Sequence, residues 1–395
     1  FLVNSDLEKE QTGIFAATGK SAIEMNTLTG EMLGYPSVNH GNKLEINFSL
    51  PPAGSLLLFI PASGRAEYEI PARPQSFSDV SSASPLTVKM DRENVLTIDF
   101  CDIQTGNEQA KDLNTYYAAD MAYRYHGFRN GNPWNSSVQY RTRIIDRDTF
   151  DIGTGFSVSY HFEVKGVTDF SSFRAVIERP WLWRVKINGL ETEPNEGEWW
   201  LDRSFGVFDI SKHVRTGKNT IDLSVSPMRI HAEIEPVYIL GLFSVEPAPK
   251  GWIITPRRNS YTTGSWREQG LPFYSWGATY SKEFNIDQPE GVYEVGLGQW
   301  NGTVSEVIVN GQPAGVIAFP PYRRDVTSLI GPGINMIEVK VTGSLKNLLG
   351  PNHNNPAPGF VAPGTWRNVR SYPSGIDYQM IDYGLMEEFT LFNGK

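Results

Sequence analysis

Hydrophobic and polar residues alternate in short stretches along most of the chain. In Lys43–Leu50 every second residue is hydrophobic: Leu44, Ile46 and Phe48. A period of two is typical of a strand with one face buried and one face in solvent. Turn residues separate such stretches, and we predict strands at Phe1–Asn4, Gly13–Ala16, Ala22–Met25, Lys43–Leu50, Ser55–Ile60, Val95–Phe100, Phe156–Val164, Phe173–Glu178, Arg184–Ile187, Thr220–Val225, Tyr238–Val245, Ala278–Phe284, Gly291–Leu297, Val304–Val309, Asn335–Val341 and Met386–Leu391.

One stretch, at about residues 107–125, has the spacing of a helix instead. Leu113, Tyr117 and Met121 recur at intervals of four and would lie on one face. We therefore predict a single helix here, inserted between strands, and expect its hydrophobic face to cover a sheet.

The composition favours the same architecture. Of the 395 residues, 37 are Gly and 26 are Pro, and 12% are aromatic. This combination favours many short strands joined by turns over a helix bundle. With 40% hydrophobic and 20% charged residues, wholesale disorder is excluded.

Two sequence signals occur twice in the same order. Val185–Gly189 and Val307–Gly311 are each a hydrophobic strand ending in Asn-Gly, the strongest short signal for a hairpin turn. Each is followed by an Asp-Ile/Val-Ser/Thr triplet and then by Gly-x-Asn-x-Ile, and the Asp-to-Asn distance is ten residues in both copies. The repeat indicates one sandwich used twice.

These patterns predict an all-β chain of two or three domains, at roughly 150 residues per domain. We expect a small N-terminal β-sandwich over residues 1–62. A jelly-roll sandwich with the helical insertion would span 63–248, and a second jelly roll 249–395. Because about 60 residues is marginal for an independent domain, the first module is expected to pack on a neighbour or to complete a domain upstream.

Charge and cysteine content narrow the function classes. The formal net charge is −9 at pH 7 and no basic run occurs, which argues against nucleic acid as a partner. No hydrophobic run is long enough for a membrane span. The single cysteine, Cys101, follows a hydrophobic strand, where a buried and inert thiol is expected. The start at Phe1 resembles a piece cut from a longer chain.

Carboxylates are the first candidates for chemistry, because glycoside hydrolysis needs two of them across the scissile bond. Glu233 and Glu235 are two residues apart and would share a strand face, and Glu178 lies near Pro180–Trp183, where a hydrophobic setting would raise its pKa. A solvated or structural role is the stronger interpretation of all three. The sequence has no Gly-x-Ser-x-Gly elbow, His-x-x-x-His pair or Gly-rich phosphate loop, and its six histidines are scattered.

Aromatic residues beside turns are the better signal, because sugars stack on rings and hydrogen-bond to nearby polar groups. One such cluster is Glu198–Asp202. The candidate substrate-binding residues come from two others: Trp266, Tyr274, Trp276, Trp300, Tyr322, His353 and Trp366. The competing interpretation is that these rings fill sandwich cores or module interfaces.

Residues 351–363 form a long loop with four prolines. It is expected either to bind a ligand or to clasp an absent domain. Its amide and carbonyl oxygens could hold a structural calcium ion, but no clear set of acidic ligands accompanies them. No other cofactor is expected.

The repeated signals resemble the galactose-binding-like jelly roll that serves many glycoside hydrolases as a sugar-binding domain. More specifically, Glu235–Val245, Gln269–Tyr280 and Asp382–Leu385 resemble the C-terminal region of large bacterial enzymes of the α-L-rhamnosidase type (glycoside hydrolase family 106). Phe1–Asn4 and Asn26–Glu31 are similar to the small sandwich that follows the barrel of those enzymes. The resemblance covers almost the whole chain.

The resemblance implies that the catalytic carboxylates lie on an N-terminal (β/α)8 barrel, and these residues show no such alternating pattern. The chain would then be a non-catalytic part of a secreted or periplasmic bacterial enzyme. It would support the catalytic domain, bind carbohydrate and act with the parent on plant or microbial polysaccharide. A free-standing carbohydrate-binding or adhesive protein is the alternative. An enzyme whose site is built on the sandwiches would instead require a deep cleft with two close carboxylates.

Overall fold

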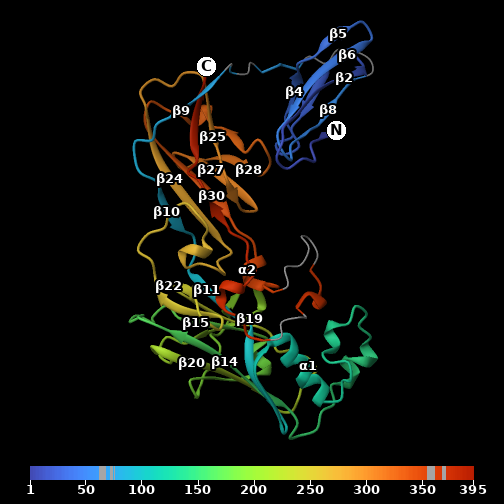
Figure 1. Cartoon of the computed structure of the whole chain (residues 1–395), viewed down its shortest axis with the longest axis vertical. Coiled ribbons are helices and arrows are strands. Elements are labelled where there is room, and N and C mark those ends of the chain that lie inside the picture. Colours follow the sequence, from blue (N-terminus) through green and yellow to red (C-terminus); the bar gives the residue numbers. More distant parts are fainter. Residues whose placement is uncertain (62–67, 72–73, 75, 354–360, 367–370) are drawn as a thin grey trace. The chain divides into compact units, whose positions relative to one another are not determined.

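The computed structural model describes residues 1–61, 68–71, 74, 76–353, 361–366 and 371–395 (Figure 1). Strands dominate it, which confirms the predicted all-β class. The chain divides into two compact units: unit 1 holds residues 1–87, 279–341 and 385–395, and unit 2 holds 88–278 and 342–384. This division differs from the expected boundary after residue 248, because residues 249–278 and 342–384 pack with unit 2.

The first 61 residues form a small sandwich, here called the N-terminal module. Two three-stranded sheets, of order β2–β6–β5 and β4–β3–β8, and the pair β1–β7 make it up. Its core is Ala22, Leu44 and Ile46, packed by Phe15 and Tyr35 among others. The strands are β1 (Leu2–Val3), β2 (Gln11–Thr18), β3 (Ala22–Met25), β4 (Met32–Tyr35), β5 (Val38–His40), β6 (Lys43–Leu50), β7 (Ser55–Leu56) and β8 (Leu58–Phe59).

Unit 2 contains two larger sheets. One has the order β11–β21–β15–β19–β18, and the other β13–β12–β14–β20–β16–β17 with β22 and β23 joined to it. A single core of buried residues from both sheets lies between them. The strands are β11 (Asn94–Ile98), β12 (Phe100–Thr105), β13 (Glu108–Asn114), β14 (Phe156–Val164), β15 (Arg174–Glu178), β16 (Arg184–Ile187), β17 (Leu190–Glu191), β18 (Trp199–Trp200), β19 (Asp202–Asp209), β20 (Gly217–Val225), β21 (Val237–Gly241), β22 (Phe243–Pro247) and β23 (Trp252–Pro256).

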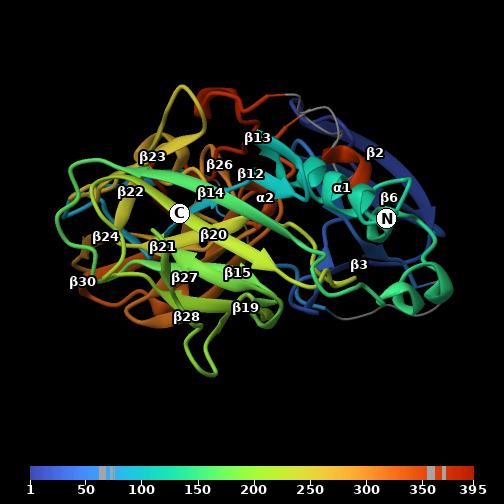
Figure 2. The same cartoon turned by 90° about the horizontal axis from the view of Figure 1, so that it is seen from below.

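The predicted helix is only half as long as expected. Helix α1 spans Thr115–Tyr125, with the side chain of Asn114 accepting from the backbone N–H of Tyr116 as its N-cap. Residues 108–114 are instead strand β13, because Gly106 (φ 52°) allows a tight turn that pairs β13 with β12. α1 packs against β12 and β13 (Figure 2).

The buried face of α1 also differs from the prediction. Thr115, Ala118, Ala119, Ala122 and Tyr123 are buried, whereas Tyr117 and Met121 are half-buried. Leu113 lies in β13. Small residues face the sheet, since they let the helix approach it closely. The remaining short helices of unit 2 are η1 (Pro133–Asn135), η2 (Arg141–Arg143), η3 (Ile145–Arg147), η4 (Pro180–Leu182), η5 (Arg267–Gln269), α2 (Lys346–Leu349), η7 (Pro363–Trp366) and η8 (Gly375–Asp377).

Unit 1 also contains a second, larger pair of sheets. In one, β24, β30, β27 and β28 lie side by side in that order; the other has the order β29–β25–β32–β9, so the C-terminal strand lies beside β9 (Figure 1). The elements are β9 (Phe77–Val80), β24 (Gly277–Ile286), β25 (Val292–Gly296), β26 (Trp300–Asn301), β27 (Val304–Val309), β28 (Gln312–Ile317), β29 (Arg323–Asp325), η6 (Thr327–Leu329), β30 (Gly333–Thr342) and β32 (Thr390–Gly394). Two further strands, β10 (Thr87–Met90) and β31 (Gly384–Leu385), lie where the chain passes from one unit to the other.

Several of the predicted strands are corrected. The stretch Val95–Phe100 spans the end of β11 at Ile98 and the start of β12 at Phe100. The last strand begins at Thr390, not at Met386, and the stretch Tyr238–Val245 is two strands interrupted at Leu242, whose side chain is exposed. The prediction treats every hydrophobic residue as buried, so it cannot detect an exposed hydrophobic residue within a hydrophobic run.

The two copies of the internal repeat make matching hydrogen bonds in the structure. In unit 2, Asn219 donates to the carbonyls of Arg215 (2.7 Å) and Gly217 (3.0 Å), and it accepts from Arg215 N (2.9 Å) and Asn188 Nδ2 (2.9 Å). Asn188 in turn accepts from Thr220 N at 3.0 Å.

Unit 1 repeats the arrangement. Asn335 donates to the carbonyls of Gly331 (2.8 Å) and Gly333 (3.0 Å), and it accepts from Gly331 N (2.9 Å) and Asn310 Nδ2 (3.0 Å). Asn188 and Asn310 both have positive φ, 50° and 52°, as the first residue of an Asn-Gly hairpin turn requires. The two copies therefore share one buried polar anchor that fixes a hairpin turn to the following long strand.

Loss of this anchor is expected to destabilise the folded protein. Asn219→Ala and Asn335→Ala are each expected to lower the free energy of unfolding by about 2–4 kcal/mol, because each leaves three partly buried backbone groups without their partner. Urea unfolding followed by tryptophan fluorescence measures it, with the exposed Asn301→Ala as the control. A loss no larger than that of the control would contradict the role of the anchor.

Candidate functional site

Two of the candidate binding residues are core residues of unit 2. Trp266 is 1% exposed and Tyr274 is fully buried, and their rings meet edge to face at 5.5 Å. The Tyr274 hydroxyl donates to the carbonyl of Gly277 (2.8 Å) and accepts from Arg92 N (3.1 Å). Rings enclosed in this way offer no face to a ligand, so these two side chains are explained by packing.

Trp276 and His353 are also held by packing contacts. Trp276 is half-buried, with the guanidinium of Arg92 4.6 Å from its ring centre. His353 is 8% exposed, and its Nε2 lies 2.8 Å from Oδ2 of Asp99. The other oxygen of Asp99 accepts from the Tyr378 hydroxyl at 2.7 Å. His353 thus completes a buried polar cluster.

Trp300 and Tyr322 contact each other. Both are half-buried in unit 1, and their rings meet edge to face at 5.6 Å. His353 and Trp366 belong to unit 2. Of the loop 351–363, residues 354–360 lie outside the described part of the chain.

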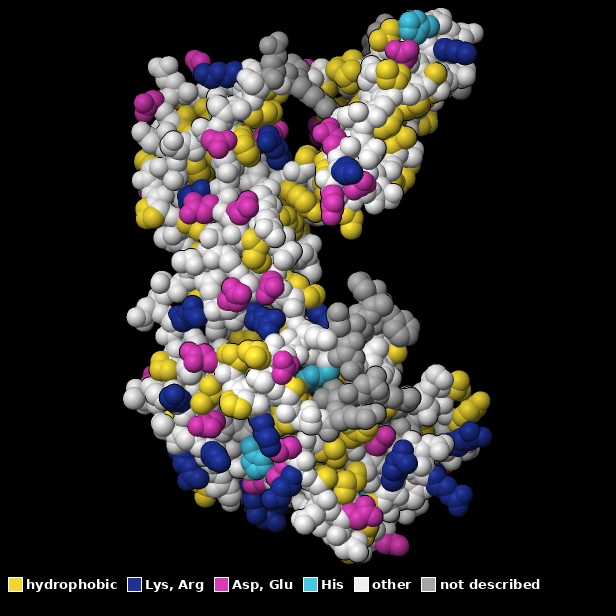
Figure 3. All heavy atoms as spheres, viewed as in Figure 1, with side chains coloured by type: hydrophobic (Ala, Val, Ile, Leu, Met, Phe, Trp, Pro, Cys, Tyr) yellow, Lys and Arg dark blue, Asp and Glu magenta, His cyan; other side chains and the backbone are white. Residues whose placement is uncertain are grey.

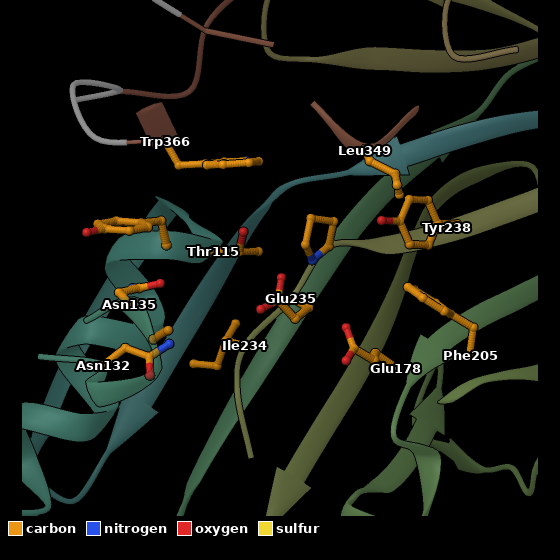
Figure 4. A pocket seen from close by; sticks show the side chains of 13 residues that line it. Thr115, Asn132, Asn135, Glu178, Phe205, Ile234, Glu235, Tyr238, Leu349 and Trp366 are labelled. Atoms are coloured by element: carbon orange, nitrogen blue, oxygen red, sulfur yellow. The ribbon is translucent and has the colours of Figure 1, made fainter. Parts of the chain in front are cut away.

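Trp366 is a candidate binding residue that lines a pocket. Unit 2 contains a cavity of about 280 Å³, near the lower end of the roughly 300–1,000 Å³ that small-molecule pockets occupy. We call it the unit 2 pocket. Figure 4 shows Trp366 on one side and the carboxyl groups of Glu235 and Glu178 near the middle of the lining. It is lined by Thr115, Tyr116, Ala119, Asn132, Asn135, Glu178, Phe205, Ile234, Glu235, Pro236, Tyr238, Leu349 and Trp366.

The segment 228–236, which turns at Ile230–His231, brings Glu235 to this pocket. Met228, Ile230, Ala232 and Ile234 are buried, whereas Glu233 and Glu235 are half-buried. Hydrogen bonds hold the backbone in place: Tyr123 and Trp134 both donate to the carbonyl of Ile230, at 2.7 and 2.8 Å. The Tyr160 hydroxyl donates to the carbonyl of Glu235 at 2.6 Å.

Glu178 enters the pocket from the end of β15. It lies directly opposite Phe205 of β19, which also lines the cavity. The strand stops there because Arg179 adopts a left-handed conformation (φ 49°) before Pro180. The side chain of Glu178 is 22% exposed.

Glu233 lies next to the pocket, and each of its carboxylate oxygens accepts a hydrogen bond. Arg179 Nη1 donates to its Oε1 at 3.0 Å, and Asn132 Nδ2 donates to its Oε2 at 2.9 Å. Arg179 also donates to the carbonyl of His231 and lies 3.4 Å from Glu178. Glu233 is thus a structural ion-pair partner, which agrees with the structural interpretation of that residue.

The two carboxyl groups in the pocket are harder to ionise than usual. Burial raises the pKa of Glu235 to about 8, with further contributions from the negative charges of Glu233 and Glu178. Burial also raises the pKa of Glu178, and the nearby Arg179 opposes that effect. The expected upward shift for Glu178 is confirmed. Perturbed carboxyl groups in a cavity mark a candidate functional site.

A tight turn positions the amide groups of the pocket. Gly131 (φ 82°) must be glycine, because a Cβ there would lie 2.2 Å from Oδ1 of Asp120. The same Oδ1 accepts from the backbone N–H of Asn132 at 2.7 Å. The turn leads into η1, whose last residue, Asn135, lines the cavity.

The pocket therefore combines acids, amides and rings within unit 2. The sequence pointed to Trp366, Glu178 and Glu235 but not to their juxtaposition, and it missed Tyr116, Asn132, Asn135 and Phe205. One signal was available for Glu235: the alternation of hydrophobic residues from Met228 to Ile234. The four missed residues come from three separate segments, which no short pattern connects.

Other chemistry finds little support in the described part of the chain. No group of three or more His, Cys, Asp or Glu side chains there could hold a metal ion, so the calcium prediction has no described ligand set. Cys101 is buried, and burial raises its pKa, as expected of an inert thiol. No described helix has the length and hydrophobicity that a membrane span requires. Acidic and basic side chains are interspersed on the face drawn in Figure 3.

No protein-family model matches the chain. A 122-residue part, 29% of the chain, is 30% identical to 10% of a curated protein of Formosa agariphila named "Putative beta-glucuronidase". The chain thus spans a small fraction of that relative.

Solved structures similar to the chain are also of glycoside hydrolases. The rhamnosidase of Novosphingobium sp. PP1Y is 16% identical with a TM-score of 0.24, over 61% of this chain and 23% of that one. The α-L-rhamnosidase of Streptomyces avermitilis, complexed with L-rhamnose, is 16% identical with a TM-score of 0.25, over 82% and 33%. The β-D-mannosidase of Dictyoglomus thermophilum is 8% identical with a TM-score of 0.26, over 63% and 31%. TM-scores of this size carry no argument about function.

The pKa of Glu235 predicts a pH-dependent stability. In the folded protein this carboxyl stays protonated up to about pH 8, whereas in the unfolded chain it ionises near its usual value of 4.5. The wild type therefore loses stability as the pH rises from about 4.5 to 8, by at most about 1.4 kcal/mol per pH unit. Glu235→Gln removes this loss, so its free energy of unfolding should exceed that of the wild type increasingly from pH 5 to pH 8.

Urea unfolding at pH 5, 6, 7 and 8 tests this prediction. The exposed Glu193→Gln provides the matched control and should show no such trend. A difference between Glu235→Gln and wild type that is the same at every pH would contradict the shifted pKa.

Proposed function

We propose that this chain is the β-sandwich region of a glycoside-hydrolase-related protein and that unit 2 binds a saccharide in its pocket. The observation that carries the proposal is the lining, which combines the carboxyl groups of Glu178 and Glu235 and the amide of Asn135 with the rings of Tyr116 and Trp366. Sugar hydroxyls pair with carboxyl and amide groups, and the C–H faces of a sugar pack on aromatic rings.

The finer features of the proposal come from the resemblance. The parent protein would be a bacterial enzyme of the α-L-rhamnosidase type, secreted or periplasmic, with its catalytic domain in another part of the longer chain. The sandwiches would support that domain and hold carbohydrate near it. Local identity to a protein named as a glucuronidase supports the glycoside-hydrolase relation and leaves the sugar open.

Trp300 and Tyr322 are proposed as a second carbohydrate contact, in unit 1. Their half-buried rings meet edge to face at 5.6 Å. The free-standing carbohydrate-binding or adhesive protein remains the alternative, and it would use the same surfaces without a catalytic partner.

A second candidate function is hydrolysis in the unit 2 pocket itself. The observation that favours it is that two carboxyl groups with raised pKa values line one cavity. Glycosidases use one such group as acid and another as nucleophile or base.

Saccharide binding is tested by isothermal titration calorimetry with L-rhamnose, D-mannose, D-galactose and their methyl glycosides. Trp366→Ala and Asn135→Ala are expected to weaken binding about tenfold, since each removes a contact of roughly 1–1.5 kcal/mol. The exposed Trp199→Ala, outside the pocket lining, is the matched control, and Trp300→Ala reports on unit 1. Unchanged affinity in both pocket variants would remove the pocket from the proposal.

Turnover separates the two candidate functions. The 395-residue chain is expected to leave p-nitrophenyl α-L-rhamnoside and β-D-glucuronide intact, whereas the full-length gene product should cleave one of them. Hydrolysis by the chain alone that is lost in Glu178→Gln and Glu235→Gln would establish the pocket as an active site and refute the supporting role.

A further inference from the structure

We propose that the unit 2 pocket takes an uncharged sugar unit and discriminates against sugars that carry a carboxylate, such as uronic acids. The inference rests on the proposed saccharide binding and adds the class of sugar. The inference contrasts with the name of the curated relative, a putative β-glucuronidase, because a glucuronide carries a carboxylate.

The charges of the lining carry the argument. Among the described residues that line the pocket, Glu178 and Glu235 are acids and none is Lys, Arg or His. Proteins that bind carboxylate ligands do so with Arg, Lys or backbone N–H groups, most strongly through a bidentate guanidinium. The described lining has two acids and no cationic side chain of this kind.

The guanidinium of Arg179, next to the pocket, is already paired. Arg179 contacts Glu233 at 3.0 Å, Glu178 at 3.4 Å and the carbonyl of His231 at 3.1 Å. One positive charge therefore pairs with two carboxyl groups, and its effect on Glu235 is smaller than that of the negative charges of Glu233 and Glu178. The negative charges of Glu233 and Glu178 already disfavour the ionisation of Glu235. A ligand carboxylate would add another negative charge in the same poorly solvated space.

An uncharged sugar meets this lining without that cost. Its hydroxyls can donate to the carboxylate of Glu178 and accept from a protonated Glu235 or from the amide of Asn135. The ring of Trp366 supplies a surface for a C–H face. Every polar group in this arrangement gains a partner without bringing in a new charge.

The selection applies to the sugar unit inside the pocket. A neighbouring hollow shares Tyr116, Asn132 and Asn135 with the pocket and is also lined by Asp120 and Arg124, whose charged groups lie 4.0 Å apart. A longer glycan could extend there. The test therefore uses methyl monosaccharides, which are too short to occupy the pocket and the neighbouring hollow together.

The experiment compares matched ligands on the whole chain by calorimetry at pH 7.5. The methyl glycoside that binds best in the panel above is compared with the same glycoside bearing a carboxylate at C6, and with the corresponding carboxamide. The uronate is expected to bind at least tenfold more weakly than the parent glycoside, and the carboxamide within about threefold of it. Glu178→Gln should narrow the gap, because it removes a repelling carboxylate. Glu235→Gln should change the gap less, because the Glu235 carboxyl is largely protonated at this pH.

Glu193→Gln, an exposed carboxyl outside the pocket, is the control and should leave the ratio unchanged. Uronate binding as tight as that of the neutral glycoside would overturn the inference while leaving saccharide binding in place. So would uronate binding that depends on Arg367, tested with Arg367→Ala. If no saccharide in the panel binds, the proposed function itself fails.

Discussion

A polar group that leaves water must find a partner inside the protein, and the sandwiches of this chain are organised around that requirement. In both copies of the repeated unit one buried asparagine pairs its amide with the backbone near the start of its own strand and with the asparagine of the Asn-Gly turn, Asn219 with Asn188 and Asn335 with Asn310. The turn is thereby fixed to the long strand that follows it. The strands β20 and β30 that carry these anchors are paired within the sheets of their respective units. Removing the anchor would leave several backbone groups unpaired at once, which explains why both copies carry the same pair of asparagines.

The same requirement shapes the pocket of unit 2, but there it is met incompletely. Glu233 is satisfied by Arg179 and Asn132, whereas Glu235 and Glu178 face the cavity with pKa values raised mainly by burial. A fold gains nothing in stability from holding carboxyl groups in this way. The proposed saccharide gives these two groups the partners that packing does not supply, and under the proposal the same acids would disfavour a charged sugar.

The candidate site shows how far sequence reasoning reached and where it stopped. Aromatic residues beside turns pointed to a saccharide, yet Trp266 and Tyr274 are enclosed in the core, since a ring next to a turn packs inward as readily as outward. Glu178 and Glu235 were each identified but were weighed as structural residues, because nothing in the chain indicates that positions 178 and 235 line one cavity. Asn132 and Asn135 carry no signal of their own. Their place depends on a turn at Gly131 that packs against Asp120 of α1.

The sequence by itself determined the β class, most strand positions and the duplicated sandwich, because period-two alternation and Asn-Gly turns are local properties of the backbone. It also placed a helix before Tyr125 but not its start, since a strand and a helix compete for residues 107–114 and the pairing of β12 with β13 decides between them. Only the tertiary structure decided which rings are enclosed, which segments group into a unit, and that two acids distant in sequence meet in one pocket. Those outcomes depend on packing between segments far apart in the chain. A local sequence pattern does not show which distant segments will pack together.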